Sequence, residues 1–210
     1  MEKFITELIL LAPPLLLALT FHEFAHGYVA YQLGDPTAKN LGRLTLNPIK
    51  HLDPIGTIAF FFIKFGWAKP VPVNPQYFKD PKRDMLWVAL AGPATNFVLA
   101  IVSAALAKGL WFFASQLPYS TMAEAILVPL NGMLIASVWI NLVLCIFNFL
   151  PIPPLDGSRI LMGLLPNRMA VSYMKFEKYG FIFVLVLAFS GVLSKVIMPV
   201  ISFANGLLLS

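Results

Sequence analysis

Residues 9–33 read ILLAPPLLLALTFHEFAHGYVAYQL, in which a run of apolar residues leads into two histidines and a glutamate. His22 and His26 are four residues apart, so on a helix they lie on one face, about one turn from each other. Glu23 then lies about 100° around the helix axis, where it stays free to accept a proton. This His-Glu-x-x-His spacing predicts a zinc site of the metalloprotease type in or beside a membrane-spanning helix.

Chance and a purely structural role are the two alternatives to a metal site. The chain of 210 residues holds only 3 histidines, and random placement of residues gives about 0.001 expected matches to the motif. Two buried histidines could instead only form hydrogen bonds within a helix bundle. Ionisable groups at membrane depth are costly and are usually functional, which favours the metal site.

The composition is far from that of a soluble domain. Hydrophobic residues make up 59% of the chain, charged residues 12%, and the mean hydropathy is +0.79. Soluble domains carry about 25% charged residues, so the chain is predicted to be an integral membrane protein. Its length allows one domain, residues 1–210, with about four to six spans of about 20 residues each. The single Cys145 excludes an intramolecular disulfide, and we expect it to be a small packing residue.

The formal net charge of +5 comes from basic residues that gather in connectors between the apolar segments. Segment 34–84 holds 8 of the 15 Lys and Arg, segment 151–178 holds 4, and segment 114–121 holds none. This pattern sets membrane topology and argues against a nucleic-acid partner. We expect a protein of the cell (plasma) membrane with its amino terminus outside and both basic connectors in the cytoplasm. The His-Glu motif and the proline-rich corner at 151–154 then share the cytoplasmic face.

Three spans are predicted at about 4–33, 85–113 and 122–150, with a turn at 114–121 between the last two. Pro13-Pro14 either kinks the first span or starts its main helical part, and Gly34 stops it. The early apolar segment lacks a small-residue cleavage site, so we interpret it as a retained span and not as a signal peptide.

The remaining segments complete the expected fold. Residues 57–65 are rich in β-branched and aromatic side chains, which predicts extended structure, as a hairpin or a membrane-dipping segment. A short helix is expected over 157–165, and residues 179–209 suffice for one span and a shorter helix, separated near Gly191 or Pro199. One or two crossings of this tail both stay open. The predicted fold is an all-α polytopic membrane protein with about four to six transmembrane helices and a short extended or β segment in the first cytoplasmic connector.

A catalytic zinc takes three protein ligands and keeps a fourth position for water, so an acidic residue must complete the site. Asp156 is favoured, because it follows the third span, whose inner end is expected level with the two histidines. The prolines before it fix its direction, and Gly157 permits close approach to another backbone. Asp156 could instead only cap the helix that begins at Gly157. The candidates for this third ligand are Asp35, Asp53, Asp80, Asp84, Glu124, Asp156 and Glu177.

The His-Glu motif together with Asn148-x-x-Pro151-x-Pro153-x-x-Asp156-Gly157 resembles the site-2 protease family of intramembrane zinc metalloproteases. Ala91-Gly92-Pro93-x-x-Asn96 matches a further segment of that family, and the likeness extends from about residue 10 to about residue 190. The resemblance implies one Zn²⁺ per chain held by His22, His26 and Asp156, and Glu23 as the catalytic base. It also implies hydrolysis of peptide bonds in a transmembrane protein substrate, by a minimal form without a PDZ or nucleotide-sensing domain.

Four further features each allow a functional and an ordinary interpretation. Asn148 could stabilise the oxyanion that develops during hydrolysis, or only bond to neighbouring backbone. His51 could donate to the transition state or carry protons, or be an ordinary loop histidine. The proline-rich segment 66–74 could clamp an unwound substrate by edge pairing, or be a surface loop. Asn96 is expected to form hydrogen bonds across the bundle, beside the site.

The alternative function is a membrane metal-binding or metal-transport protein without proteolytic activity. Such a protein would use the same ligands, but it needs polar residues spaced through several spans, and the later spans show few. A catalytically silent scaffold is disfavoured because both motifs are intact. We therefore expect a zinc metalloendopeptidase whose partners are a transmembrane protein substrate and the lipid bilayer.

Overall fold

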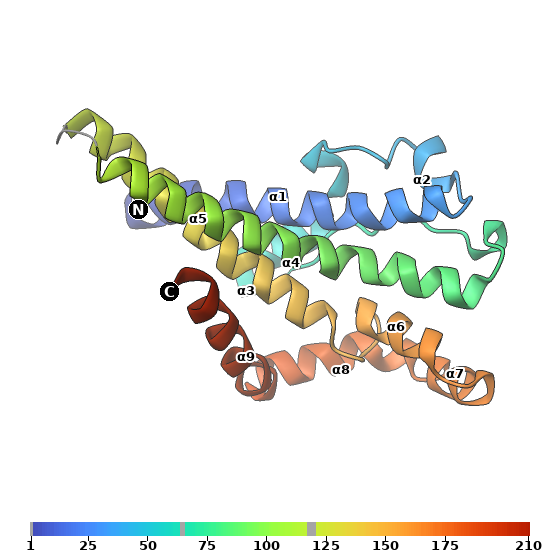
Figure 1. Ribbon diagram of the computed structural model, residues 1–210. Helices are drawn as coiled ribbons and strands as arrows, with labels where there is room; N and C mark the ends of the chain where they lie inside the picture. The colour runs from blue at the N-terminus through green and yellow to red at the C-terminus, as the bar shows by residue number, and fades with distance from the viewer. Residues whose placement is uncertain (1, 64–65, 117–120) are drawn as a thin grey trace.

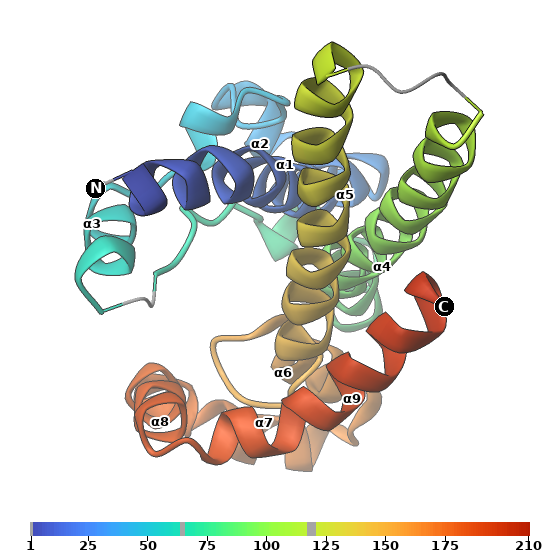
Figure 2. The same ribbon diagram turned by 90° about the vertical axis from the view of Figure 1, so that its left-hand side faces the viewer.

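Long apolar helices dominate the computed structural model, which describes residues 2–63, 66–116 and 121–210. Four helices in this part are long and apolar enough to cross a membrane: α1 (Glu2–Gln32), α4 (Pro81–Ala114), α5 (Thr121–Asn148) and α9 (Val192–Leu209). α1, α4 and α5 pack against one another (Figure 1). Figure 2 shows that α5 crosses α1 and that α9 lies beside α4 and α5, away from α1.

Small residues line the surfaces where these helices meet. Ala18 and Ala30 of α1 are fully buried, as is Ala100 of α4. Helices in lipid associate through close packing of such residues, because the hydrophobic effect gives no force between them there. Large apolar side chains point outward instead, as Phe203 does with 75% of its surface exposed. This distribution is the one expected of a bundle surrounded by lipid.

The first three predicted spans are confirmed, with ends that differ by a few residues. α1 runs without interruption through Pro13 and Pro14, so the prolines do not start the helix. Gly34 follows the end of α1 with a left-handed φ of 106°, which is the predicted stop. The turn predicted at 114–121 is described only at its ends, because residues 117–120 lie outside the described part.

The carboxyl-terminal region contains two helices separated at Gly191, one of the two predicted positions. α8 (Glu177–Phe189) has 13 residues, and α9 has 18. At 1.5 Å per residue, α8 is about 20 Å long and is too short to cross a hydrocarbon core of about 30 Å by itself. Gly191 adopts a left-handed φ of 74°, and Pro199 lies inside α9. By length, α9 is the one span of the tail.

The extended structure predicted for residues 57–65 is wrong where the structure describes it, since α3 (Pro54–Ile63) is a helix. Residues 64 and 65 lie outside the described part. The carboxylate of Asp53 accepts the backbone N–H of Gly56 at 2.8 Å, and Pro54 occupies the first helical position. These are strong helix-start signals. They outweigh the β preference of the aromatic and β-branched residues, which depends on a neighbouring strand, and the described residues provide none.

No strand occurs within residues 2–63, 66–116 and 121–210, so the short β segment of the predicted fold is not confirmed. One isolated antiparallel bridge joins Leu52 to Ala68, and the N–H of Lys69 donates to the carbonyl of His51 at 2.9 Å. Residues 66–74 are neither helix nor strand. The other short elements of the connector are α2 (Thr37–Asn40), η1 (Pro48–His51) and η2 (Pro75–Tyr77).

Two short helices connect α5 to α8 at the end of the bundle where α1 stops (Figure 1). They are α6 (Asp156–Leu164), which confirms the predicted short helix, and α7 (Asn167–Met174). The hydroxyl of Tyr173 donates to the carbonyl of Pro151 at 2.6 Å, and Arg159 pairs with Glu177 at 3.7 Å. The proline-rich corner after α5 is therefore attached to the segments that follow it.

Replacing Gly180 by alanine tests how α8 is attached to this corner. A Cβ at Gly180 would lie 2.2 Å from the carbonyl oxygen of Pro153, whereas a Cβ at Gly206 of α9 would meet no atom within 4 Å. We expect Gly180→Ala to lower the unfolding free energy by about 1–3 kcal/mol through overpacking. Gly206→Ala should leave it unchanged or slightly raised. Thermal unfolding in detergent measures both, and equal midpoints for the two variants would contradict the packing of α8 described above.

Candidate active site

Two histidines of α1 face the same point in the interior of the protein. The Nε2 atoms of His22 and His26 are 3.0 Å apart, and their rings are nearly perpendicular, at 84°. The residues are 6% and 9% exposed. Their spacing of four residues on a continuous helix produces this convergence, as the sequence predicts.

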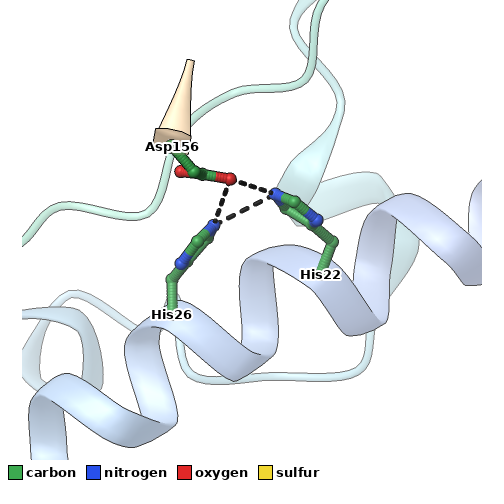
Figure 3. A group of neighbouring side chains, drawn as sticks. All are labelled: His22, His26 and Asp156. Carbon is green, nitrogen blue, oxygen red and sulfur yellow. Dashed lines mark hydrogen bonds and ion pairs between the residues drawn. The ribbon is translucent and has the colours of Figure 1, made fainter. Parts of the chain in front are cut away.

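Asp156 approaches the histidine pair from α6. Its Oδ2 atom lies 3.1 Å from His22 Nε2 and 3.3 Å from His26 Nε2 (Figure 3). Within the described residues, these three side chains are the one cluster of three or more potential metal ligands. The capping alternative for Asp156 is wrong, because Leu155 is the N-cap residue of α6 and no side chain makes a capping bond there.

Gly157 lets Asp156 reach this position. A Cβ at Gly157 would lie 2.3 Å from the carbonyl oxygen of Phe149 and 2.4 Å from that of Leu150. The start of α6 therefore folds back onto the end of α5, which requires a residue without a side chain. The predicted close approach at Gly157 is confirmed.

Each histidine is oriented by an oxygen atom at its other ring nitrogen. His22 Nδ1 lies 2.5 Å from Asn96 Oδ1, and His26 Nδ1 lies 2.7 Å from the carbonyl oxygen of Val88. Because a carbonyl oxygen can only accept, both Nδ1 atoms carry a hydrogen, and in the neutral imidazoles both Nε2 atoms present a lone pair. Asp156 Oδ2 is buried, and its polar neighbours are these two Nε2 atoms, at 3.1 and 3.3 Å. Three electron-pair donors thus face one another.

Three electron-pair donors in contact repel each other unless a proton or a metal ion lies among them. In a tetrahedral zinc site with Zn–N distances of about 2.0–2.1 Å, neighbouring ligand atoms are about 3.3 Å apart. The separations here are 3.0, 3.1 and 3.3 Å. Two imidazoles and one carboxylate are also a ligand set of catalytic zinc, which leaves a position for water. The residues therefore fit zinc.

Helix α4 packs against the two histidines at Gly92, which is buried. A Cβ at this position would lie 2.4 Å from His26 Nε2 and 2.6 Å from His22 Nε2. Any side chain at position 92 would therefore occupy the space among the ligand atoms. Gly92 belongs to the segment Ala91-Gly92-Pro93. A glycine is needed at this position because the histidine rings leave no room for a Cβ.

Glu23 lies next to His22 in α1 and is partly buried. Its Oε2 atom accepts the backbone N–H of Val71 at 2.8 Å, and the side chain of Val71 packs over Gly27 one turn further along α1. The carboxylate does not belong to the ligand cluster. Segment 66–74 contacts this carboxylate through Val71.

A sequence profile of Peptidase family M50 matches residues 10–192. The chain belongs to this family. It is 43% identical to "Putative zinc metalloprotease YwhC" of Bacillus subtilis, over 96% of this chain and 92% of that protein. Two more distant relatives are "Putative zinc metalloprotease Rip2" of Mycolicibacterium smegmatis and "Zinc metalloprotease MJ0392" of Methanocaldococcus jannaschii. They are 29% and 28% identical, over 86% and 78% of this chain and over 66% and 36% of their own lengths.

No solved structure matches the chain significantly. The family match confirms the resemblance to the site-2 proteases that the motifs indicated. This M50 protein is therefore an intramembrane zinc metalloendopeptidase with Zn²⁺ as its cofactor, carried on helices long enough to span a membrane.

Asn148 and His51 of the M50 protein form hydrogen bonds with backbone carbonyls. The amide of Asn148 donates to the carbonyl of Leu144 in its own helix at 3.0 Å, which is the backbone contact considered above. His51 is 1% exposed, and its Nε2 lies 2.8 Å from the carbonyl oxygen of Thr45. Neither contact tests the catalytic roles predicted for these residues.

Most of the other acidic candidates hold the connectors together. Asp35 is fully buried and accepts the N–H groups of Thr37 and Asn74, at 2.9 and 2.7 Å. Asp80 caps α4 by accepting the N–H of Arg83 at 3.1 Å. These contacts explain why carboxylates occur at such positions without contributing to the site.

Asn96 and Asn141 extend the hydrogen bonding of His22 into the bundle: Asn96 contacts His22, and Asn141 contacts Asn96. Asn96 bonds across the bundle to α1 and α5, which is the role expected for it. Asn141 was not identified from the sequence, although a buried amide within an apolar span is itself a signal of function. Val71 was also missed, because no local pattern indicates that a loop amide will contact a glutamate 48 residues earlier.

The substitution Gly92→Ala tests the packing of the site. We expect the methyl group to displace the histidine rings and to weaken zinc binding about 10–100-fold, the range seen when ligand support is altered. Gly109→Ala on the same helix is the matched control, because a Cβ there meets no atom within 4 Å. Competition with a chelator measures the zinc dissociation constant of both variants. Unchanged zinc affinity in Gly92→Ala would contradict the closeness of α4 to the two histidines.

Proposed function

We propose that His22, His26 and Asp156 hold the zinc ion and that the protein hydrolyses peptide bonds in transmembrane or membrane-proximal segments of other membrane proteins. The observation that carries the proposal is the convergence of two imidazole nitrogens and one buried carboxylate oxygen, at 3.0 to 3.3 Å from one another. These are the separations and the ligand types of a tetrahedral zinc site. The enzyme would serve regulated intramembrane proteolysis, in which a membrane-bound protein is released by cleavage.

Glu23 is the proposed general base and acid. Zinc, when bound, supplies a Lewis acid that polarises the scissile carbonyl and makes water more acidic. The carboxylate of Glu23 accepts a proton from the attacking water and returns it to the leaving amine. Only Oε2 of this carboxylate is bonded to Val71, so Oε1 remains for the water.

Asn148 keeps the role proposed for it in stabilising the oxyanion. A side-chain amide carries two hydrogens, and one of them forms the hydrogen bond with the carbonyl of Leu144. The second hydrogen is the donor that the developing negative charge would use. Asn148 lies eight residues before Asp156, across the corner that positions the carboxylate.

Segment 66–74 is the proposed binding surface for an unwound substrate. Three hydrogen bonds of its backbone hold it in place. The carbonyl of Lys69 accepts from the guanidinium of Arg43 at 2.8 Å. The N–H groups of Val71 and Asn74 donate to the carboxylates of Glu23 and Asp35. Val71 is 8% exposed, so the segment is packed against α1 and is no detached surface loop. Pro70 and Pro72 keep the backbone extended, and their carbonyls can accept from a substrate strand.

The active site is proposed to face the cytoplasm of the cell membrane. The two connectors that flank the site hold 8 and 4 of the 15 Lys and Arg, and such connectors stay inside. The end of α1, the proline-rich corner and α6 lie at one end of the bundle (Figure 1). A site near this end needs only a short path for the water that hydrolysis consumes.

Metal transport is the less favoured function. Polar residues do continue from His22 into α4 and α5, but the asparagines among them are buried and bonded to one another. Within the described residues they add no second cluster of metal ligands. A transport path would need such clusters in succession.

Replacing Glu23 by glutamine tests the proposed chemistry. The variant should bind zinc normally and cleave a single-span membrane protein at least about 100-fold more slowly, because general acid–base catalysis is lost. Glu7→Gln, at an exposed glutamate of the same helix, is the matched control and should cleave at the normal rate. Cleavage is followed by gel electrophoresis of purified enzyme and substrate in detergent, with and without a zinc chelator. Cleavage by Glu23→Gln at the normal rate, or cleavage that resists chelation, would contradict the proposal.

A further inference from the structure

A chain of buried amides leads from His22 into the bundle, away from the three ligand atoms. Asn96 of α4 is fully buried, and Asn141 of α5 is 1% exposed. Asn96 Oδ1 lies 2.5 Å from His22 Nδ1, and Asn96 Nδ2 donates to Asn141 Oδ1 at 2.8 Å. Amides inside membrane-spanning helices are costly to bury, so their position behind a metal ligand calls for a function.

The hydrogen bonds of Asn96 fix which of its atoms faces the histidine. Its NH2 group also donates to the backbone carbonyl of Ala18 at 3.2 Å. Both amide hydrogens are therefore used, one on Ala18 and one on Asn141. A rotated amide would place its oxygen against two acceptor oxygens, which is unfavourable. Asn96 must present its oxygen to His22.

Asn141 is fixed in the same way by its own helix. Its NH2 group donates to the backbone carbonyl of Ser137 at 2.9 Å and lies 3.2 Å from the Ser137 hydroxyl. A backbone carbonyl can only accept, so the oxygen of Asn141 must face Asn96. The backbone carbonyls of Ala18 in α1 and Ser137 in α5 thus determine the orientation of both amides.

We propose that Asn141 is a positioning residue that acts through Asn96 to keep the hydrogen of His22 on Nδ1, so that Nε2 presents its lone pair to zinc. The inference rests on the proposed function of His22 as a ligand. Asn141 itself contacts no ligand atom and no reacting group. It removes the alternative in which Asn96 turns its NH2 group toward His22 and drives the hydrogen to Nε2.

His26 shows why the effect is specific to one ligand. Its Nδ1 donates to the backbone carbonyl of Val88, which no side-chain substitution can turn. His22 instead depends on two side-chain amides, each able to rotate. The amides between α4 and α5 therefore control one of the two imidazoles and leave the other unaffected.

The variants Asn141→Ala and Asn141→Leu test this proposal in the full-length protein. Both remove the acceptor for Asn96, and we expect the zinc dissociation constant to rise about 10-fold or more, within the range seen for groups that orient metal-bound histidines. Competition with a fluorescent chelator measures the constant without any assay of cleavage. The two replacement side chains differ in size, so if one variant fails to fold, the other can still be measured.

Ser103→Ala is the matched control. The Ser103 hydroxyl lies 2.8 Å from the Ser137 hydroxyl, at the far end of the same polar chain, and does not touch either amide. Its removal should leave zinc affinity unchanged. Thermal unfolding of the zinc-free forms is measured in parallel, because a merely structural role of Asn141 would lower stability and leave the zinc affinity of the folded protein as it was.

A double-mutant cycle decides whether Asn141 acts through Asn96. In the background Asn96→Ala, the further change Asn141→Ala should not weaken zinc binding again, since the connection is already broken. Equal zinc affinity in wild type and both Asn141 variants would overturn the inference, as would fully additive losses in the cycle. Failure of the wild-type protein to bind zinc would instead overturn the proposed function, so the two failures are distinguishable.

Discussion

The structure depends on the convergence of three potential metal ligands on one point. His22, His26 and Asp156 place two nitrogens and one oxygen within 3.0 to 3.3 Å of each other in the interior of a helix bundle. Buried polar atoms cost free energy when they lack a partner, and more so when like atoms face each other. Zinc bound among them, as proposed, would contribute stabilisation that the apoprotein lacks and would link the metal to the stability of the fold.

Residues without side chains make this contact possible. Gly92 lets α4 pass directly over the ligand atoms, and Gly157 lets the start of α6 fold back on the end of α5. Alanines such as Ala18 and Ala100 bring the helices close elsewhere. Packing of this kind is how helices associate in lipid, so the same small residues that stabilise the bundle also define the shape of the site. The proline-rich corner then directs Asp156 toward α1, and the loop amide of Val71 reaches Glu23 from the other side.

The long helices and the convergence of His22 and His26 could be predicted from the sequence because each has a local cause. Lipid requires long apolar helices, and His22 and His26 share a face through helical spacing alone. The break at Gly191 followed from its freedom to adopt a left-handed conformation. Residues 57–63 were predicted wrongly, because their β-branched and aromatic composition favours a strand, whereas the helix start at Asp53-Pro54 makes them helical. Asn141 and Val71 could not be placed, since their contacts depend on how α5 and the first connector pack against α1 and α4.

Zinc K-edge X-ray absorption of the purified protein tests the central claim most directly. The account predicts nitrogen and oxygen ligands at about 2.0–2.1 Å with the scattering pattern of two imidazoles, and no sulfur. In Asp156→Ala the two imidazoles should remain while one protein oxygen is lost or replaced by solvent and zinc affinity falls. A sulfur ligand at about 2.3 Å, or zinc bound with unchanged affinity and unchanged ligands in Asp156→Ala, would contradict the account.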